Sequence, residues 1–144
     1  MSFQTLTLEI DNHVATITLN RPEMMNAFSE QLIWEMGEAT KTVKDDSQIR
    51  VLVITGEGRG FTAGADLSER DASWSDTKDA LERGYYPFLK NIIDMPKPVI
   101  GSINGAAAGI GAAVAMACDL RIMAKEAYIM SVFSNIALVP DGGL

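Results

Sequence analysis

Several residue types are scarce in this sequence of 144 residues, and each scarcity excludes a class of protein. Cys118 is the only cysteine in the sequence, so no disulfide framework is expected and a reducing compartment is the default. Twelve Lys and Arg residues against nineteen Asp and Glu give a formal charge of −7. An acidic chain disfavours nucleic acid and anionic membrane surfaces as partners, because both favour a basic surface.

Sequence signals for export and for membrane insertion are also missing. No apolar run approaches the about 20 residues that a membrane-spanning helix needs, and the stretch 103–116 is short and rich in Gly and Ala. The first ten residues alternate polar and apolar side chains, which is typical of a strand rather than a signal peptide. We therefore expect a cytoplasmic protein that does not enter a membrane.

Residues that carry metal-dependent or nucleophilic chemistry are sparse as well. The sequence has no Walker loop, no nucleophile elbow and no metal-ligand spacing. His13 is the only histidine; it follows a turn, and we expect it to lie on the surface. Cys118 lies in a small-residue segment and is expected to be a core thiol. We expect neither a metal site nor a catalytic histidine or cysteine.

The order of apolar patterns predicts an α/β protein. Hydrophobic residues make up 47% of the sequence, enough for one domain with a substantial core. Ser29 is a suitable N-cap for one helix, Pro87 is expected to kink or divide another, and Asp119 is expected to end a third. Strands and helices alternate along the chain, which favours the α/β class. The predicted elements are strands 6–10 and 14–19, helix 30–43, strand 49–54, a loop or short helical turns at 61–76, helix 81–92, strand 98–103, helix 111–117, and strands 120–123 and 128–132.

Two loops of small residues are the most informative feature. They are Phe61-Thr-Ala-Gly-Ala-Asp-Leu67 and Asn104-Gly-Ala-Ala-Ala-Gly-Ile-Gly111, and each follows an apolar run. Small side chains leave backbone N–H groups open to an oxyanion or a phosphate, and the second loop also opens a helix with unpaired N–H groups. Each loop alone is more simply a tight turn, but two of them favour a paired-donor site.

The order and spacing of these motifs resemble the crotonase superfamily, the enoyl-CoA hydratase/isomerase enzymes that act on acyl-CoA thioesters. The resemblance implies a crotonase-like ββα superhelical spiral, with residues 1–144 as the N-terminal part of a single core domain. It also implies an acyl-CoA substrate, no separate cofactor because CoA is part of the substrate, and a homotrimer or dimer of trimers. The motifs that carry it are Asn20-Arg21-Pro22, Asn26-Ala27, Phe61-x-Ala-Gly-Ala-Asp66, Pro96-Lys97-Pro98, Asn104-Gly105, Cys118-Asp119 and Pro140-x-Gly-Gly143.

The resemblance also assigns roles to individual backbone groups. The first oxyanion donor of the family falls on Ala65 and the second on Ile110, whose N–H groups would polarise the thioester. Backbone around a further set of residues falls where the family holds the adenine and pantetheine parts of CoA. These residues are Met25, Ala63, Asp66, Leu67 and Ser68.

The sequence departs from the hydratase pattern at both water-handling carboxylates. Alanine stands at position 113 and phenylalanine at position 133, where a hydratase of this family has glutamates. Asp141 matches the single acid of isomerase-type members, and double-bond migration needs only one carboxylate. The residue types of Pro140-Asp-Gly-Gly143 also suit a plain solvated turn. We expect apolar neighbours to raise the pKa of Asp141, namely Phe133, Ile136, Leu138 and Val139.

An acyl-CoA isomerase with Asp141 as its base is therefore the preferred interpretation. Three alternatives stay open: a hydratase with an altered water site, a CoA-binding member of the family without catalysis, and a dinucleotide-binding module. The last rests on Gly109-x-Gly111-x-x-Val114, which opens a predicted helix after a predicted strand. It lacks the expected acid for a ribose, since Ile129 stands at that distance.

Overall fold

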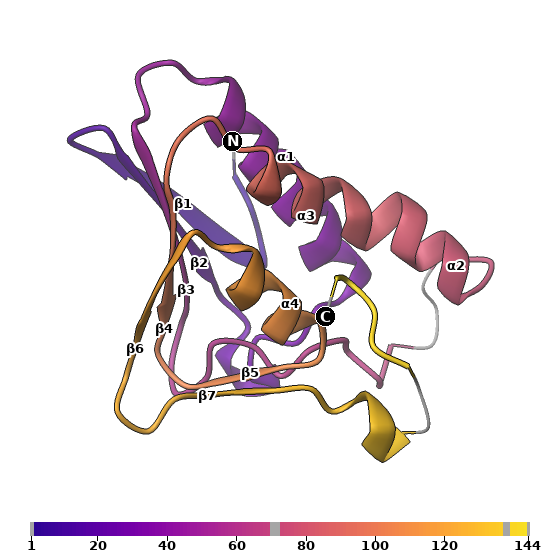
Figure 1. The fold of residues 1–144 in the computed structure, drawn as a ribbon. Helices are drawn as coiled ribbons and strands as arrows, with labels where there is room; N and C mark the ends of the chain where they lie inside the picture. The colour runs from indigo at the N-terminus through magenta and orange to yellow at the C-terminus, as the bar shows by residue number, and fades with distance from the viewer. Residues whose placement is uncertain (1, 70–72, 137–138, 144) are drawn as a thin grey trace.

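The computed structural model of the chain describes residues 2–69, 73–136 and 139–143. Its main layer is a five-stranded sheet with the order β1-β2-β3-β4-β6 (Figure 1). β1 and β2 form the predicted hairpin, and every other pairing in this sheet is parallel. The strands are β1 (Leu6–Asp11), β2 (Val14–Leu19), β3 (Val51–Gly56), β4 (Val99–Ile103) and β6 (Leu120–Met123).

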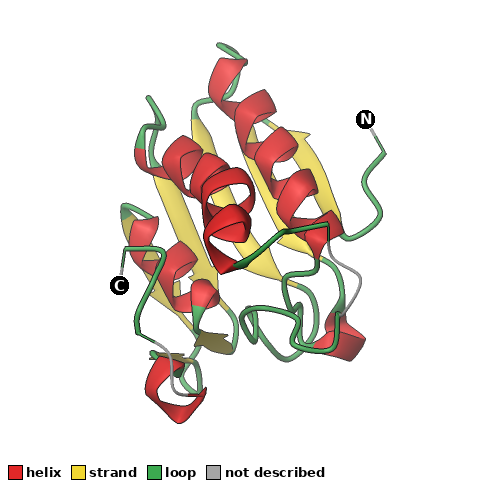
Figure 2. Cartoon of the chain, turned by 90° about the vertical axis from the view of Figure 1, so that its right-hand side faces the viewer, coloured by secondary structure: helices red, strands yellow, loops and turns green. Residues whose placement is uncertain are grey.

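Helices α1 and α3 cover one face of the sheet (Figure 2). α1 spans Glu30–Asp45, and the Ser29 hydroxyl caps it by accepting a hydrogen bond from the Leu32 N–H at 3.3 Å. The apolar residues at helical spacing, including Met36 and Val43, are fully buried. The alternating burial of β2 and β3 supplies the other side of this core.

Pro87 divides the second helical segment, as the sequence predicts. The segment starts as α2 (Thr77–Asp79), continues as a π-helical turn over Ala80–Tyr85, and becomes α3 (Tyr86–Ile93) with Pro87 in its first turn. Pro87 lies inside a continuous helical run, and the π-helical turn directly before it supplies the local irregularity that a proline requires. Phe88 of α3 stacks on Phe28 with ring centroids 5.5 Å apart, which joins α3 to the loop before α1.

A second, two-stranded parallel sheet pairs β5 (Ala106–Ala108) with β7 (Tyr128–Met130). The sequence of this segment predicts only a loop, because three alanines in a row show neither helical nor strand periodicity. α4 (Ile110–Ala117) follows β5 directly, and a short 3₁₀ helix occupies Phe133–Ile136. The second sheet therefore lies next to the glycine-rich start of α4 (Figure 1).

Asp119 has a different role from the predicted one. α4 ends at Ala117, and the Asp119 carboxylate instead accepts a hydrogen bond from the Val99 N–H at 2.8 Å. The Asp119 N–H in turn donates to the Val99 carbonyl at 2.9 Å. The residue fixes the start of β4 beside β6, and the helix that it was expected to end stops two residues earlier. Within the described ranges, no helix is both long enough and apolar enough to cross a bilayer.

Candidate active site

The two small-residue loops, residues 61–67 and 104–111, lie side by side and are called the donor loops below. Thr62 pairs with Ala107 in a parallel β-bridge. The Thr62 N–H donates to the Ala106 carbonyl at 2.9 Å, and the Ala108 N–H donates to the Thr62 carbonyl at 3.0 Å. Segments more than forty residues apart in the sequence are thus held together by backbone hydrogen bonds, so their N–H groups are fixed relative to each other.

Glycine is required at two points of this contact. Gly64 has a φ of +101°, and a Cβ there would lie 2.9 Å from the Ala108 carbonyl oxygen. A Cβ at Gly111 would collide with the Thr62 side chain. Both residues therefore allow an approach of the two donor loops that a larger residue would prevent.

The N–H of Ala65 is available to a ligand. Its neighbours are used within the protein: the Gly64 N–H donates to the Thr62 hydroxyl at 3.2 Å, and the Asp66 N–H donates to the Phe28 carbonyl at 3.0 Å. Among the described residues, the Ala65 N–H has no such acceptor, and Ala65 is exposed. It is the one amide of these three that remains free to bind an oxyanion.

The N–H of Ile110 is available for a different reason. Ile110 is the first residue of α4, and the first N–H groups of a helix have no acceptor within that helix. The preceding Gly109 N–H is used, because it donates to the Met130 carbonyl at 3.1 Å. Gly109 adopts a φ of +54°, a conformation that favours glycine. Because glycine has no side chain, the start of the helix is left uncovered. The macrodipole of α4 adds positive character at this end.

The three residues predicted to be catalytic line one cavity of about 120 Å³, which is called the site cavity below. Ala65 and Ile110 come from the two donor loops, and Asp141 comes from the end of the described chain. The remaining wall is mainly apolar. It is lined by Ala63, Gly64, Leu67, Tyr85, Gly109, Val132 and Phe133.

Asp141 places an unpartnered carboxylate oxygen in this region. Its Oδ1 atom is buried and has no hydrogen-bond partner among the described residues. Burial raises the pKa of Asp141 above its ordinary value, because desolvation disfavours the charged form. A buried carboxylate without a donor is a stronger base than a solvated one, so the residues that line the site cavity would be able to supply two N–H donors and a proton acceptor.

The apolar surroundings of Asp141 differ in part from the expected ones. Phe133 is buried and lines the site cavity, as predicted. Val139 was expected there too, but its side chain is 80% exposed, because the apolar wall comes from segments distant in the sequence. The side chain of Ile136 and the residue Leu138 lie outside the described part of the chain. Val132 and Tyr85 also supply apolar surface to the cavity wall, although their sequence patterns do not predict this.

Positions 113 and 133, where the resemblance places the two hydratase glutamates, carry packed apolar side chains. Phe133 fills part of the cavity wall, and Ala113 is buried in α4. Gly142 lies against Ala113 so closely that a Cβ on Gly142 would come within 2.9 Å of the Ala113 Cβ and 2.8 Å of Ile110 Cδ1. A longer side chain at position 113 would therefore displace the segment that carries Asp141. The position of Asp141 therefore depends on a small side chain at position 113.

The residues expected to contact CoA lie in the first donor loop or beside it. Met25 is in the left-handed region with a φ of +52°, and its carbonyl accepts a hydrogen bond from the Ala63 N–H at 2.9 Å. Leu67 is 77% exposed, and Ser68 follows it on the surface. Ala63 and Leu67 open onto the site cavity. The chain that follows Ala65 is thus exposed at Leu67 and Ser68.

The side chain of Asp66 is occupied by contacts within the protein. Its carboxylate accepts from the Ser68 hydroxyl at 2.6 Å and from the Arg21 guanidinium at 3.0 Å. The Ser68 hydrogen bond, followed by the Arg21 contact, lowers the pKa of Asp66, so this carboxylate stays ionised. Arg21 also donates to the Ala27 carbonyl. The ion pair ties the donor loop to the segment before α1.

The weaker sequence candidates lie away from this chemistry. His13 is exposed in the β1–β2 turn, and its Nδ1 lies 2.8 Å from the Gln48 carbonyl oxygen. Cys118 is buried, and burial raises the pKa of its thiol to about 12. Across the described ranges, His, Cys, Asp and Glu side chains form no group of three able to hold a metal. Ile129 lies in β7 and supplies no acid for a ribose.

Comparison with known proteins decides the family. The enoyl-CoA hydratase/isomerase family model matches residues 9–144. The chain belongs to this family. It is 41% identical to the 1,2-epoxyphenylacetyl-CoA isomerase of Escherichia coli over 93% of this chain and 53% of that protein. It is 40% identical to a Rhodobacter capsulatus protein named "Probable enoyl-CoA hydratase", over 99% of this chain and 55% of the relative.

The same family appears among solved structures. A Magnetospirillum magneticum protein described as an enoyl-CoA hydratase/carnithine racemase superposes with a TM-score of 0.88 and 31% identity. The match covers 97% of this chain and 54% of that structure. The fold is thus the α/β crotonase-like fold that the sequence resemblance implied. The chain spans about half the length of the relatives that it matches.

In this member of the enoyl-CoA hydratase/isomerase family, Tyr85 lines the site cavity although its sequence pattern does not predict a place in the site. Tyr85 follows the helical spacing of Leu81, Phe88 and Ile92, so its position indicates only a buried helix face. The π-helical turn ending at Tyr85 brings the side chain to the cavity. A proline two residues later is the signal that the helix would not be regular at this point.

Proposed function

We propose that the protein is an acyl-CoA double-bond isomerase in which Asp141 is the base. The observation that carries the proposal is that Asp141, whose buried Oδ1 has no hydrogen-bond partner among the described residues, lines one cavity together with Ala65 and Ile110. The relative from Escherichia coli is itself named as an isomerase of a CoA thioester, which supports this reading. The substrate class is a 3-enoyl-CoA thioester.

The two backbone amides would act on the thioester oxygen. When a proton leaves C2, negative charge moves onto this oxygen and forms a dienolate. The N–H groups of Ala65 and Ile110 would donate to the oxyanion, and a single donor of this kind contributes about 3–4 kcal/mol to transition-state stabilisation. The start of α4 adds the favourable end of a helix dipole.

Asp141 would move the proton without a second carboxylate. Its carboxylate accepts the proton from C2 while the C2–H bonding electrons shift into the dienolate. The resulting carboxylic acid returns the proton at C4, so the double bond moves from C3–C4 to C2–C3 and Asp141 is ionised again. The raised pKa of Asp141 suits both steps, because the group must first accept and then donate the proton.

Hydration is the second candidate, because one of the relatives is named a hydratase. Water addition in this site would rely on Asp141 alone, since Ala113 and Phe133 offer no oxygen to hold a water molecule. Phe133 instead makes the cavity wall apolar. We therefore expect hydration to be slow relative to isomerisation. A CoA-binding protein without turnover is the third candidate.

A substrate panel on the full-length protein separates the three. Isomerisation of 3-enoyl-CoA, hydration of 2-enoyl-CoA and conversion of a ring-epoxide CoA thioester would be followed under the same conditions. The proposal predicts migration of the double bond with little or no water addition. Robust hydration of a short 2-enoyl-CoA would favour the hydratase, and tight CoA-thioester binding without any turnover would favour a binding protein.

A further inference from the structure

Thr62 is a fully buried residue at the contact between the donor loops. Both its N–H and its carbonyl are hydrogen-bonded to the second donor loop. Its side chain contacts both loops: the hydroxyl accepts a hydrogen bond from the Gly64 N–H at 3.2 Å, and the methyl group lies against Gly111. Gly64 precedes Ala65, and Gly111 follows Ile110. One side chain is therefore connected to the neighbours of both proposed oxyanion donors.

The direction of the Ala65 N–H is set by the peptide groups on either side of it. The Gly64 carbonyl accepts a hydrogen bond from the Phe28 N–H at 2.7 Å, and the Asp66 N–H donates to the Phe28 carbonyl at 3.0 Å. Ala65 is the middle residue of this parallel bridge, so its own N–H is directed away from Phe28. This direction is what leaves the Ala65 N–H available to a ligand.

Gly64 is the residue at which this direction can change. Its φ is +101°, and a glycine has more alternative backbone conformations than any other residue. The hydrogen bond from its N–H to the Thr62 hydroxyl restrains this freedom. If the hydroxyl were removed, rotation at Gly64 would turn the peptide group that carries the Ala65 N–H.

The methyl group of Thr62 keeps the hydroxyl in place. A β-branched side chain is stiff at χ1. The Thr62 Cγ2 atom also packs so closely on Gly111 that an added Cβ at Gly111 would collide with it. The side chain cannot exchange the positions of its methyl and hydroxyl groups without losing both contacts. The hydroxyl therefore stays directed at Gly64.

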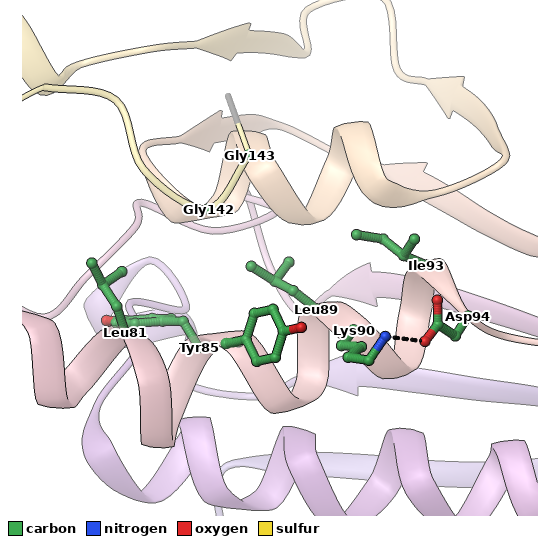
Figure 3. Close-up of a pocket in the computed structure, with 9 residues that line it drawn as sticks. Leu81, Tyr85, Leu89, Lys90, Ile93, Asp94, Gly142 and Gly143 are labelled. Atoms are coloured by element: carbon green, nitrogen blue, oxygen red, sulfur yellow. Dashed lines mark hydrogen bonds and ion pairs between the residues drawn. The ribbon is translucent and has the colours of Figure 1, made fainter.

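This arrangement does not depend on the acid at the end of the described chain. Gly142 lies beside the start of α4 (Figure 3), where it packs against Ile110 and Ala113. Gly111 lies on a different face of the helix from these two residues, because successive helical residues are about 100° apart. Thr62 thus contacts α4 away from the segment that carries Asp141.

We propose that Thr62 is a positioning residue, whose hydroxyl holds Gly64 and so keeps the Ala65 N–H directed at the thioester oxygen. The proposal rests on the proposed function, because it takes Ala65 as an oxyanion donor. Thr62 is fully buried and does not line the site cavity, so it acts through Gly64 rather than on the substrate. Its effect should therefore appear when negative charge develops on the thioester oxygen.

Two CoA thioesters separate this role from a purely structural one. Butanoyl-CoA presents a neutral thioester oxygen, whereas 3-oxobutanoyl-CoA loses a proton from C2 and forms a stable enolate with negative charge on that oxygen. Calorimetry on the full-length protein gives the affinity for each ligand. The near-ultraviolet absorbance of the enolate shows how much of the bound 3-oxobutanoyl-CoA is ionised. A purely structural defect would weaken both ligands alike and leave the ionised fraction unchanged.

Two pairs of proteins differ at the hydroxyl. The wild type and Thr62→Val have side chains of the same shape, and Thr62→Ser differs from Thr62→Ala by one oxygen. A misplacement of about 1 Å can cost about 10²-fold in rate, so loss of the hydroxyl in Thr62→Val should lower the preference for the enolate over butanoyl-CoA about tenfold or more. Thr62→Ser should keep more of this preference than Thr62→Ala. This second pair decides the question should Thr62→Val fail to fold.

Three results would overturn the proposal. They are a wild type without an enolate preference, no difference in that preference within either pair, and an equal loss of affinity for both ligands. The kinetics should agree with binding: kcat for isomerisation of 3-enoyl-CoA should fall in Thr62→Val with little change in KM, because the hydroxyl supports the transition state rather than ground-state binding.

The outcome is distinguishable from failure of the proposed function. If the enolate preference depends on the Thr62 hydroxyl but the wild type does not isomerise any 3-enoyl-CoA, the proposed reaction fails and the role of Thr62 stands. If the wild type isomerises 3-enoyl-CoA and the enolate preference ignores the hydroxyl, the reverse holds. A wild type that binds neither thioester would overturn both.

Discussion

The donor loops are tied to each other and to neighbouring segments by backbone hydrogen bonds, whereas residues 139–143 place a single carboxylate in the site cavity through a turn. Thr62 bonds the second donor loop on both of its backbone groups. In the acid segment, Gly142 and Gly143 both have positive φ, Val139 is exposed, and the Oδ1 atom of Asp141 has no partner in the described part of the chain.

Under the proposed function, this difference divides the work of the site. The two N–H donors would depend on backbone geometry, so almost any side chain at positions 65 and 110 would serve. Proton transfer would depend on one carboxylate, whose Oδ1 has no hydrogen-bond partner among the described residues. Substitutions that keep the backbone should spare the donors, whereas replacing a single oxygen of Asp141 should impair proton transfer.

Replacing the base should have the largest effect. Asp141→Asn keeps the size and turn preference of the residue but removes the basic oxygen, so kcat should fall about 10²–10⁴-fold with KM little changed. Steady-state isomerisation of 3-enoyl-CoA measures it. The melting temperature should stay equal or rise, because the variant removes a buried carboxylate without a partner. A wild-type kcat in this variant would make Asp141 a turn residue only.

The pH profile follows from the same carboxylate. The base must be ionised, and burial raises its pKa, so kcat/KM should fall as the pH drops through a value above that of an ordinary aspartate. The activity is fully present above that pKa and is lost below it. A profile that stays flat down to the ordinary range of aspartate would contradict the raised pKa.

Removal of one donor should have the next largest effect. Ile110→Pro deletes the N–H at the first position of α4, where a proline is compatible with helix geometry. The loss of one oxyanion donor should lower kcat about 10²–10³-fold. Ile110→Ala is the matched control, since it shortens the side chain and keeps the N–H; its kcat should remain within about tenfold of the wild type. Equal activity of both variants would mean that this amide does not bind the oxyanion.

Restoring one hydratase glutamate should damage the site rather than convert it. Ala113→Glu forces a long side chain against Gly142, which would move Asp141 away from the substrate. A misplacement of about 1 Å can lower the rate about 10²-fold, and hydration should not rise in compensation. Ala113→Ser is the matched small replacement and should retain most isomerase activity. Gain of hydratase activity in Ala113→Glu, with isomerisation intact, would refute the coupling of positions 113 and 142.

The smallest expected effect concerns the contact between the donor loops. Gly111→Ala would place a Cβ against the Thr62 side chain, and overpacking of this kind destabilises by about 1–3 kcal/mol. Gly37→Ala is the control, because Gly37 lies in α1 with open space around it and alanine should stabilise the helix by about 0.5–1 kcal/mol. Chemical denaturation of the full-length variants measures both. Equal stability of Gly111→Ala and the wild type would show that the donor loops are not in close contact at Gly111.

Much of the fold could be predicted from residue patterns. The β1–β2 hairpin follows from alternation around Asp11-Asn12, and α1 follows from Ser29 and the spacing of Leu32, Met36 and Val43. The second helical segment was predicted to be divided near Pro87, and the division is a π-helical turn. β5 was missed because three successive alanines have no helical or strand periodicity.

The site was predictable where it depends on glycine and alanine runs and on one acid. The loops around Ala65 and Ile110 and the acid at 141 meet in one cavity, but that meeting depends on long-range β-bridges that sequence patterns do not encode. For the same reason, sequence patterns predict neither the exposure of Val139 nor the place of Tyr85 in the cavity wall. Local spacing marks a residue as apolar or helical, whereas its neighbours are set by tertiary packing.

Incorporation of solvent deuterium tests the central claim most directly. The full-length wild type and Asp141→Asn would be incubated with 3-enoyl-CoA in deuterated water, and label at C2 and C4 followed by mass spectrometry, with thioester binding checked by calorimetry. Once the Asp141 carboxylic acid has exchanged its proton with solvent, our account predicts label at C4 of the product, and at C2 of substrate re-formed from the dienolate. Both labels should be lost in the variant while the thioester still binds. Exchange at the wild-type rate in Asp141→Asn would contradict it, because another group would then remove the proton.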